Sequence, residues 1–144
     1  MFRKIMVAYS GSPEAARALA QSIHLAKALG AELCAVTVQQ DLPPYTAYAA
    51  AVDSSLSRAL IEDQKAHCVQ LHSEARDTAW REGVKLETHL LEGHAAEAIV
   101  RFLLDNKTDL LVIGLHCHAS HISSLWSTVY EVALDAPCSV LGVH

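Results

Sequence analysis

Three histidines and a thiol are concentrated in one short segment of the chain. Residues 114–121 read Gly-Leu-His-Cys-His-Ala-Ser-His, so His116, Cys117, His118 and His121 lie close together in sequence. Imidazole nitrogens and thiolates are ligands of zinc and copper, and this segment could supply the three or four that such a site needs. The spacing matches no known ligand pattern, so a polar surface loop and a set of phosphate donors are the alternatives. We favour the hypothesis that His116 or His118 donates to a phosphate.

Apolar periodicity predicts the elements that must position this segment. Short apolar runs followed by turn residues are typical of buried strands, and the segments between them carry apolar residues at helical spacing. Ser12 is a natural N-cap before Pro13, and Gly30 is a natural residue to end the first helix. The alternation predicts a three-layer α/β fold, an open five-stranded parallel sheet with helices on both faces. We expect strands at 4–9, 32–38, 85–91, 109–114 and 138–143, and helices at 13–29, 54–81, 95–106 and 123–135.

The composition fits one domain and argues against several classes of function. A chain of 144 residues is expected to form a single domain over 1–144. The net charge of -5 argues against a nucleic-acid or anionic-membrane surface. No apolar run approaches the ~20 residues that span a bilayer, and no signal peptide is visible, so we expect a cytoplasmic protein. The cysteines are expected to be buried and unpaired in that compartment.

The loops after the first and fourth predicted strands are the candidate ligand site. In an open parallel sheet, ligands bind beyond the carboxyl ends of the strands, where neighbouring connections diverge. Ser10-Gly11-Ser12 and the segment after Gly114 both precede helices, whose amino ends favour phosphate. The chain contains no G-x-x-x-x-G-K-[ST] sequence, so it is not a Walker-type NTPase. It also lacks a G-x-G-x-x-G sequence after the first strand, which disfavours a dinucleotide-binding domain.

Several segments together resemble the universal stress protein family over essentially the whole chain. The family commonly reads I-L-V-A-x-D-G-S-x-E, where this chain reads Ile-Met-Val-Ala-Tyr-Ser-Gly-Ser-Pro-Glu. Further matches are Ala26–Leu33, Asp109–Gly114 and Ala136–Val143. The resemblance implies a cytoplasmic homodimer with the strand order 3-2-1-4-5 and an adenine-nucleotide alpha-hydrolase-like fold.

The resemblance also implies a nucleotide site. Many members bind ATP or AMP through the pattern G-x2-G-x9-G-[ST] after the fourth strand and an aspartate after the first. Gly114 and Thr128 match the pattern, Cys117 and Ser127 replace its other glycines, and Ser10 stands where the aspartate is expected. A Cβ at position 117 costs roughly 1–2 kcal/mol in a left-handed conformation. Val38 occupies the position whose backbone usually meets the base. The implied binding set is Ala8, Ser10, Gly11, Val38, Gly114, His116, Cys117, Ser127 and Thr128.

Two functions remain open. The first is a homodimeric stress-response regulator with a degenerate adenine-nucleotide pocket; it is not expected to be an enzyme, although weak ATPase or phosphoryl transfer is not excluded. The alternative is an interaction module that binds no nucleotide and responds to metal or pH through its histidine-rich loop. An unidentified protein partner is expected in either case.

Two further features bear on partners and metals. Residues 138–143 form an apolar edge strand without proline or lysine, which favours pairing with a second copy. Cys68 and His72 lie one helical turn apart, a geometry that can clamp a metal. Two ligands do not make a site, so we expect these residues on a helix surface or in a partner contact.

Overall fold

Five parallel strands form one open sheet in the computed structural model. The structure describes residues 1–39, 51, 54–116 and 122–144, except for the side chains of residues 57 and 122–127. The hydrogen-bonded order is β3-β2-β1-β4-β5, which confirms the predicted sheet. Each neighbouring pair is parallel, and β1 is the central strand. The strands are β1 (Lys4–Ala8), β2 (Glu32–Gln39), β3 (Leu86–Glu92), β4 (Leu110–Gly114) and β5 (Ser139–Val143).

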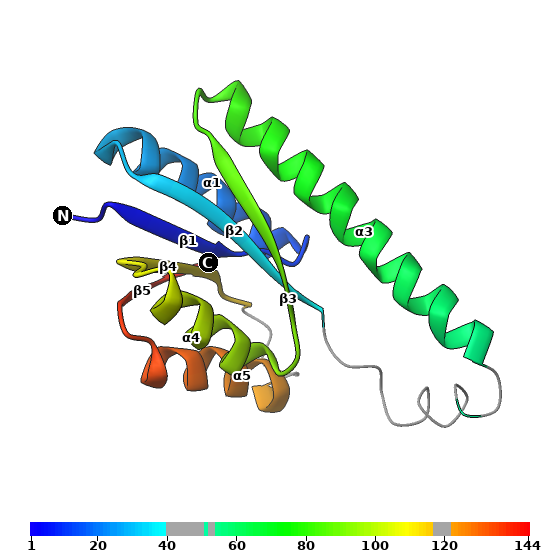
Figure 1. Ribbon diagram of the computed structural model, residues 1–144. Helices are drawn as coiled ribbons and strands as arrows, with labels where there is room; N and C mark the ends of the chain where they lie inside the picture. Colours follow the sequence, from blue (N-terminus) through cyan, green and yellow to red (C-terminus); the bar gives the residue numbers. More distant parts are fainter. Residues whose placement is uncertain (40–50, 52–53, 117–121) are drawn as a thin grey trace.

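Helices cover both faces of this sheet, as the alternation of elements predicts (Figure 1). The helices α1 and α3 lie on one face, and α4 and α5 lie on the other (Figure 1). The half of α3 that follows residue 53 extends beyond the sheet, and its residues are mostly exposed (Figure 1). Of the helices in the described ranges, none is long and apolar enough to cross a membrane. The helices are α1 (Pro13–Leu29), α3 (Ser54–Arg81), α4 (Ala95–Asp105) and α5 (Ile122–Asp135).

The central strand is apolar on both faces because helices cover it on both sides. Ile5 and Val7 belong to the core beneath α1 and α3, and Met6 belongs to the core beneath α4 and α5. All three side chains are fully buried. The apolar runs therefore gave correct strand positions, with ends that differ by one residue in each of the five strands.

The residues that cap α1 are those that its sequence predicts. Ser12 has extended backbone angles, and its Oγ accepts a hydrogen bond from the Ala15 N–H at 3.1 Å. Pro13 occupies the first helical position, where a missing N–H costs nothing. Gly30 ends the helix in the left-handed conformation, with φ of 62°. Both predicted caps are confirmed: Ser12 caps the beginning of α1 and Gly30 caps its end.

Asp109 aligns the beginnings of β1 and β4. Its Oδ2 accepts hydrogen bonds from the backbone N–H groups of Arg3 at 2.8 Å and Lys4 at 2.9 Å. These two donors, Arg3 first, lower the pKa of the Asp109 carboxyl. The register that follows pairs Ile5 with Leu110, so the two strands run side by side towards the same edge of the sheet.

Candidate functional site

The carboxyl end of β4 lies directly against the first turn of α1. A Cβ added to Gly114 would lie 2.5 Å from the backbone carbonyl of Glu14 and 2.8 Å from the nitrogen of Ala15. Side-chain carbon atoms do not approach backbone so closely, so only glycine fits at this position. The loops that follow β1 and β4 therefore meet, as expected for neighbouring strands of a parallel sheet.

A hydrogen bond joins these two loops. The Nδ1 atom of His116 lies 2.7 Å from Oε1 of Glu14. An ionised carboxylate only accepts, so Nδ1 carries the hydrogen and donates it. The backbone N–H of Glu14 itself lowers the pKa of this carboxyl most, and the hydrogen bond from His116 lowers it further. Glu14 is thus held ionised between the two candidate loops; of this pair, only His116 belongs to the predicted binding residues.

The backbone N–H groups in the first turn of α1 already have partners. The Glu14 N–H donates to its own carboxylate, and the Ala15 N–H donates to Oγ of Ser12. The Ala16 N–H donates to the Ser12 carbonyl at 2.9 Å, and Pro13 has no N–H. We expected this helix end to offer donors to a phosphate; in this structure these N–H groups have partners within the chain, and phosphate binding stays a prediction.

Ser10 and Gly11 shape the loop between β1 and α1. The exposed Ser10 hydroxyl donates to Oγ of Ser12 at 3.1 Å. Gly11 has φ of 81°, and a Cβ there would lie 2.6 Å from Cδ2 of Leu71 on α3. The glycine thus serves both the turn and the close packing of α3.

The remaining predicted binding residues fall into two groups. Ala8 and Val38 are half-buried at the carboxyl ends of β1 and β2, where both pack against the same apolar core. Thr128 is half-buried within α5. Cys117, His118 and His121, and the side chain of Ser127, lie outside the described residues. Their roles as nucleotide contacts or metal ligands stay predictions. Among residues 1–39, 51, 54–116 and 122–144, no three His, Cys, Asp or Glu residues form a group that could hold a metal.

A buried polar network lies beside this edge of the sheet. The Thr37 hydroxyl donates to the Tyr9 carbonyl at 2.7 Å, and it lies 2.7 Å from Nε2 of His72 on α3. Because the hydroxyl hydrogen is used at Tyr9, the His72 Nε2–H donates to Thr37. Burial lowers the pKa of His72, and the charges of Arg76 and His89 act in the same direction.

The predicted surface position of Cys68 and His72 is therefore wrong. Both side chains are buried, at 8% and 7% exposure. They continue a stripe with Ala75 and Ala79 that faces the sheet, whereas His67 is exposed. This helical spacing was present in the sequence, and a polar partner such as Thr37 is what permits a histidine in that stripe. The cysteines at 34, 68 and 138 are free, as expected.

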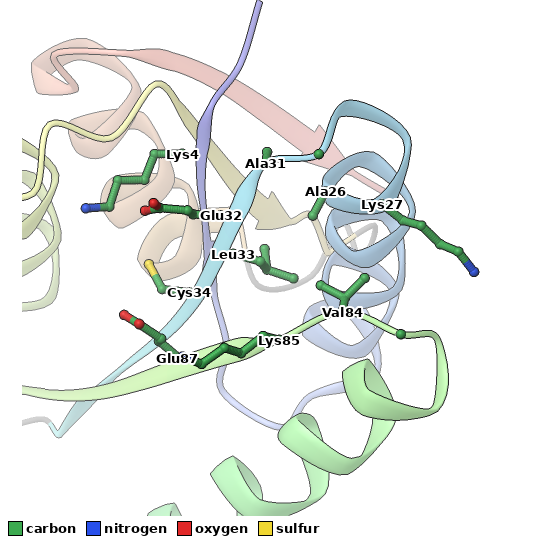
Figure 2. Close-up of a pocket in the computed structure, with 12 residues that line it drawn as sticks. Lys4, Ala26, Lys27, Ala31, Glu32, Leu33, Cys34, Val84, Lys85 and Glu87 are labelled. Carbon is green, nitrogen blue, oxygen red and sulfur yellow. The ribbon is translucent and has the colours of Figure 1, made fainter.

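The opposite edge of the sheet carries a cleft of about 480 Å³ at the amino ends of the strands. Figure 2 shows Lys4, Glu32 and Glu87 on one side of β2, with Lys27 directed away from the cleft. Burial raises the pKa of the Cys34 thiol in its wall to about 11, so that thiol is protonated at neutral pH. Ligands of open parallel sheets bind at the carboxyl ends, so we place the candidate site at the β1 and β4 loops.

Comparison with known proteins identifies the family. The model of the universal stress protein family matches residues 1–144. The chain belongs to the universal stress protein family. A universal stress protein of Thermus aquaticus is 34% identical over 149 residues, which covers 100% of both chains.

Solved universal stress proteins share the fold. UspA from Lactobacillus plantarum is 23% identical and superposes with a TM-score of 0.82 over 99% of this chain and 98% of that one. A universal stress protein in complex with cAMP is 24% identical, with a TM-score of 0.70 over 99% and 97% of the two chains. At these identities the likeness supports the fold, including the strand order of the family.

The close approach at Gly114 predicts that alanine substitution destabilises the protein more at this glycine than at Gly142. Gly114→Ala is expected to lower the free energy of unfolding by about 1–3 kcal/mol, because its Cβ would meet backbone. Gly142→Ala is the control, since its Cβ would meet only the Leu115 side chain, which can move, and no backbone atom. Urea unfolding of both variants measures the difference, and equal losses would contradict it.

The buried neutral His72 predicts a pH-dependent stability. As pH falls through about 6.5, the unfolded chain takes up a proton that the folded chain binds less readily, so the free energy of unfolding decreases. His72→Gln keeps a donor for Thr37 and does not titrate. The stability advantage of the wild type over this variant should therefore shrink between about pH 8 and pH 5.5. Denaturant unfolding measures this difference in the free energy of unfolding, and His67→Gln, at an exposed position, is the control. A difference that does not change with pH would contradict the prediction.

Proposed function

We propose that this universal stress protein is a homodimeric stress-response regulator that binds an adenine nucleotide between the loops after β1 and β4, in the cytoplasm. The observation that carries the proposal is the contact of Gly114 with the first turn of α1, which joins these two loops at the carboxyl edge of the sheet. A related protein of the same fold holds cAMP. The role is regulatory, without a catalytic residue assigned.

In this proposal, the base and the phosphate of the nucleotide contact different parts of the site. Ala8 and Val38 offer a half-buried, apolar surface at the strand ends that suits the adenine base. The amino end of α1 has its N–H groups engaged, so donors to the phosphate come from the β4 side. Gly114 and His116 begin that side, and Cys117, Ser127 and Thr128 continue the family pattern.

Nucleotide binding is tested directly on the purified chain. We expect adenine nucleotide to be released on denaturation and detected by mass spectrometry, and cAMP, AMP or ATP to bind in calorimetric titrations. Ser10→Asp restores the acceptor of the family pattern and should raise AMP affinity about tenfold, since hydrogen bonds to charged groups contribute about 1.5–3 kcal/mol. Gln21→Glu, an exposed change on α1, adds the same charge and should have no effect.

The absence of binding by the wild type and by Ser10→Asp would remove the nucleotide proposal. The Glu14 carboxylate between the two loops favours, in that case, the alternative function of an interaction module without nucleotide.

The proposed dimer forms through the edge strand β5, within residues 138–143. This strand pairs with β4 on one side only, and Leu141 is 38% exposed. An apolar edge of this kind invites pairing with another strand. Antiparallel pairing with its symmetry mate would give a continuous sheet across both copies.

A dimer is expected at micromolar concentration in size-exclusion chromatography with light scattering. Leu141→Lys should shift it to a monomer, because lysine on an edge strand disfavours pairing with another strand. The control is Val69→Lys, which replaces an exposed apolar residue on α3, a helix that packs against β3 at the other edge. A wild-type monomer, or a dimer unaffected by Leu141→Lys, would refute this interface.

A further inference from the structure

A groove of about 390 Å³ lies between α4 and α5, and none of the proposed nucleotide contacts lines it. The two helices pack against each other on one face of the sheet (Figure 1). Residues from His94 to Leu104 form the α4 side of the groove, and Glu131 and Asp135 form the α5 side. At a rise of about 1.5 Å per residue, the α4 side is about 15 Å long, or nearly three helical turns.

Apolar side chains form a stripe along the α4 side of this groove. Ala96, Val100 and Leu104 follow one another at intervals of four residues, so they lie on one face of the helix. Ala96 is buried, Val100 is half-buried and Leu104 is 57% exposed. The neighbouring Leu103 is fully buried in the core beneath α4. Leu104 is therefore an apolar side chain outside that core, and it is available for contact with another molecule.

The charged side chains that border this stripe are mostly acidic. Glu97 lies on α4, and Glu131 and Asp135 lie one turn apart on α5; all three are exposed. Arg101 is the one basic side chain among the lining residues, besides the imidazole of His94. Within the described part of the chain, none of the three carboxylates forms an ion pair with Arg101 or with any other cation. Their charges are thus open to a cationic partner.

We propose that the groove between α4 and α5 binds an amphipathic helix of another protein, one that carries a row of lysines or arginines beside its apolar face. Its apolar residues would contact Val100 and Leu104. Two of its basic residues, one turn apart, would match the spacing of Glu131 and Asp135. Recognition of a helix in a groove ordinarily uses such anchors, and the groove has the length of about three turns.

The described helices of this chain do not have the basic row that the groove requires. None of α1, α3, α4 and α5 carries two lysines or arginines three or four positions apart. The net charge of -5 also disfavours a second copy as the occupant. The acidic border repels nucleic acids and anionic membranes in the same way. The charges therefore favour a different protein with a basic helix, and they give a chemistry for the partner of a regulatory domain.

The probe that tests this inference is a synthetic peptide of about 18 residues, with a leucine stripe at helical spacing and lysines on both sides of it. Its counterpart carries glutamate at every lysine position. Fluorescence anisotropy is measured with the full chain, without nucleotide, at about 0.15 M salt. We expect the lysine peptide to bind at least tenfold more tightly than the glutamate peptide, because the carboxylates of the groove attract one and repel the other.

Paired substitutions distinguish the groove from the overall charge of the protein. Glu131→Gln combined with Asp135→Asn should weaken binding of the lysine peptide about tenfold, and Leu104→Asn about fivefold. Glu62→Gln combined with Asp63→Asn is the matched control: it removes two exposed carboxylates from α3 and should change the affinity less than twofold. Val69→Asn, at an exposed apolar position on α3, is the control for Leu104→Asn. Circular dichroism verifies that each variant is folded.

Reversal of the charges gives the decisive result. Glu131→Lys combined with Asp135→Lys should bind the glutamate peptide more tightly than the lysine peptide. Failure of the wild type to bind the lysine peptide would overturn the proposal, as would a preference that does not reverse. Equal weakening by the groove and the α3 substitutions would show attraction to the net charge alone, and it would also overturn it. The assay contains no nucleotide and alters no proposed nucleotide contact, so each of these results leaves the proposed function intact.

Discussion

The contact between Gly114 and the first turn of α1 is the constraint on which the candidate site depends. Strands β1 and β4 are neighbours, and the helix that follows β1 must turn back across the end of β4. Without a Cβ at 114, the backbone of Glu14 reaches the strand end. That approach brings its carboxylate within hydrogen-bonding distance of His116. One missing side chain thus determines the electrostatics of the loops that a ligand would occupy.

The same edge of the sheet is stabilised from its other side by Thr37 and His72. Their hydrogen bonds connect α3 to β2 and to the Tyr9 carbonyl, the residue just before the β1 loop. Leu71, next to His72, packs over Gly11 within that loop. The loop between β1 and α1 is therefore held by α3 and β2 as well as by β4, which is the rigid support that a binding loop requires.

The sequence was sufficient for the fold but only partly for the site. Apolar runs and the caps at Ser12 and Gly30 predict the strands and α1, because local periodicity and turn chemistry report burial directly. The pairing of Glu14 with His116 could not be predicted in this way, since it depends on how closely two loops approach. The burial of His72 carried a signal in its helical spacing, but a histidine in an apolar stripe is explained only by a partner on another element. The family resemblance implied a set of nucleotide contacts, and it gave no sign of the hydrogen bond between Glu14 and His116.

The Glu14–His116 pair joins positions 102 residues apart, and this separation has a consequence for synthesis of the chain. While the ribosome has released only the part up to α4, β1 has its β2 neighbour but not yet β4. Ile5, Met6 and Val7, fully buried in the finished protein, then border an unpaired strand edge. Until β4 is synthesised, this apolar edge is open to pairing with other chains; β4 then covers the edge and brings the loops after β1 and β4 together.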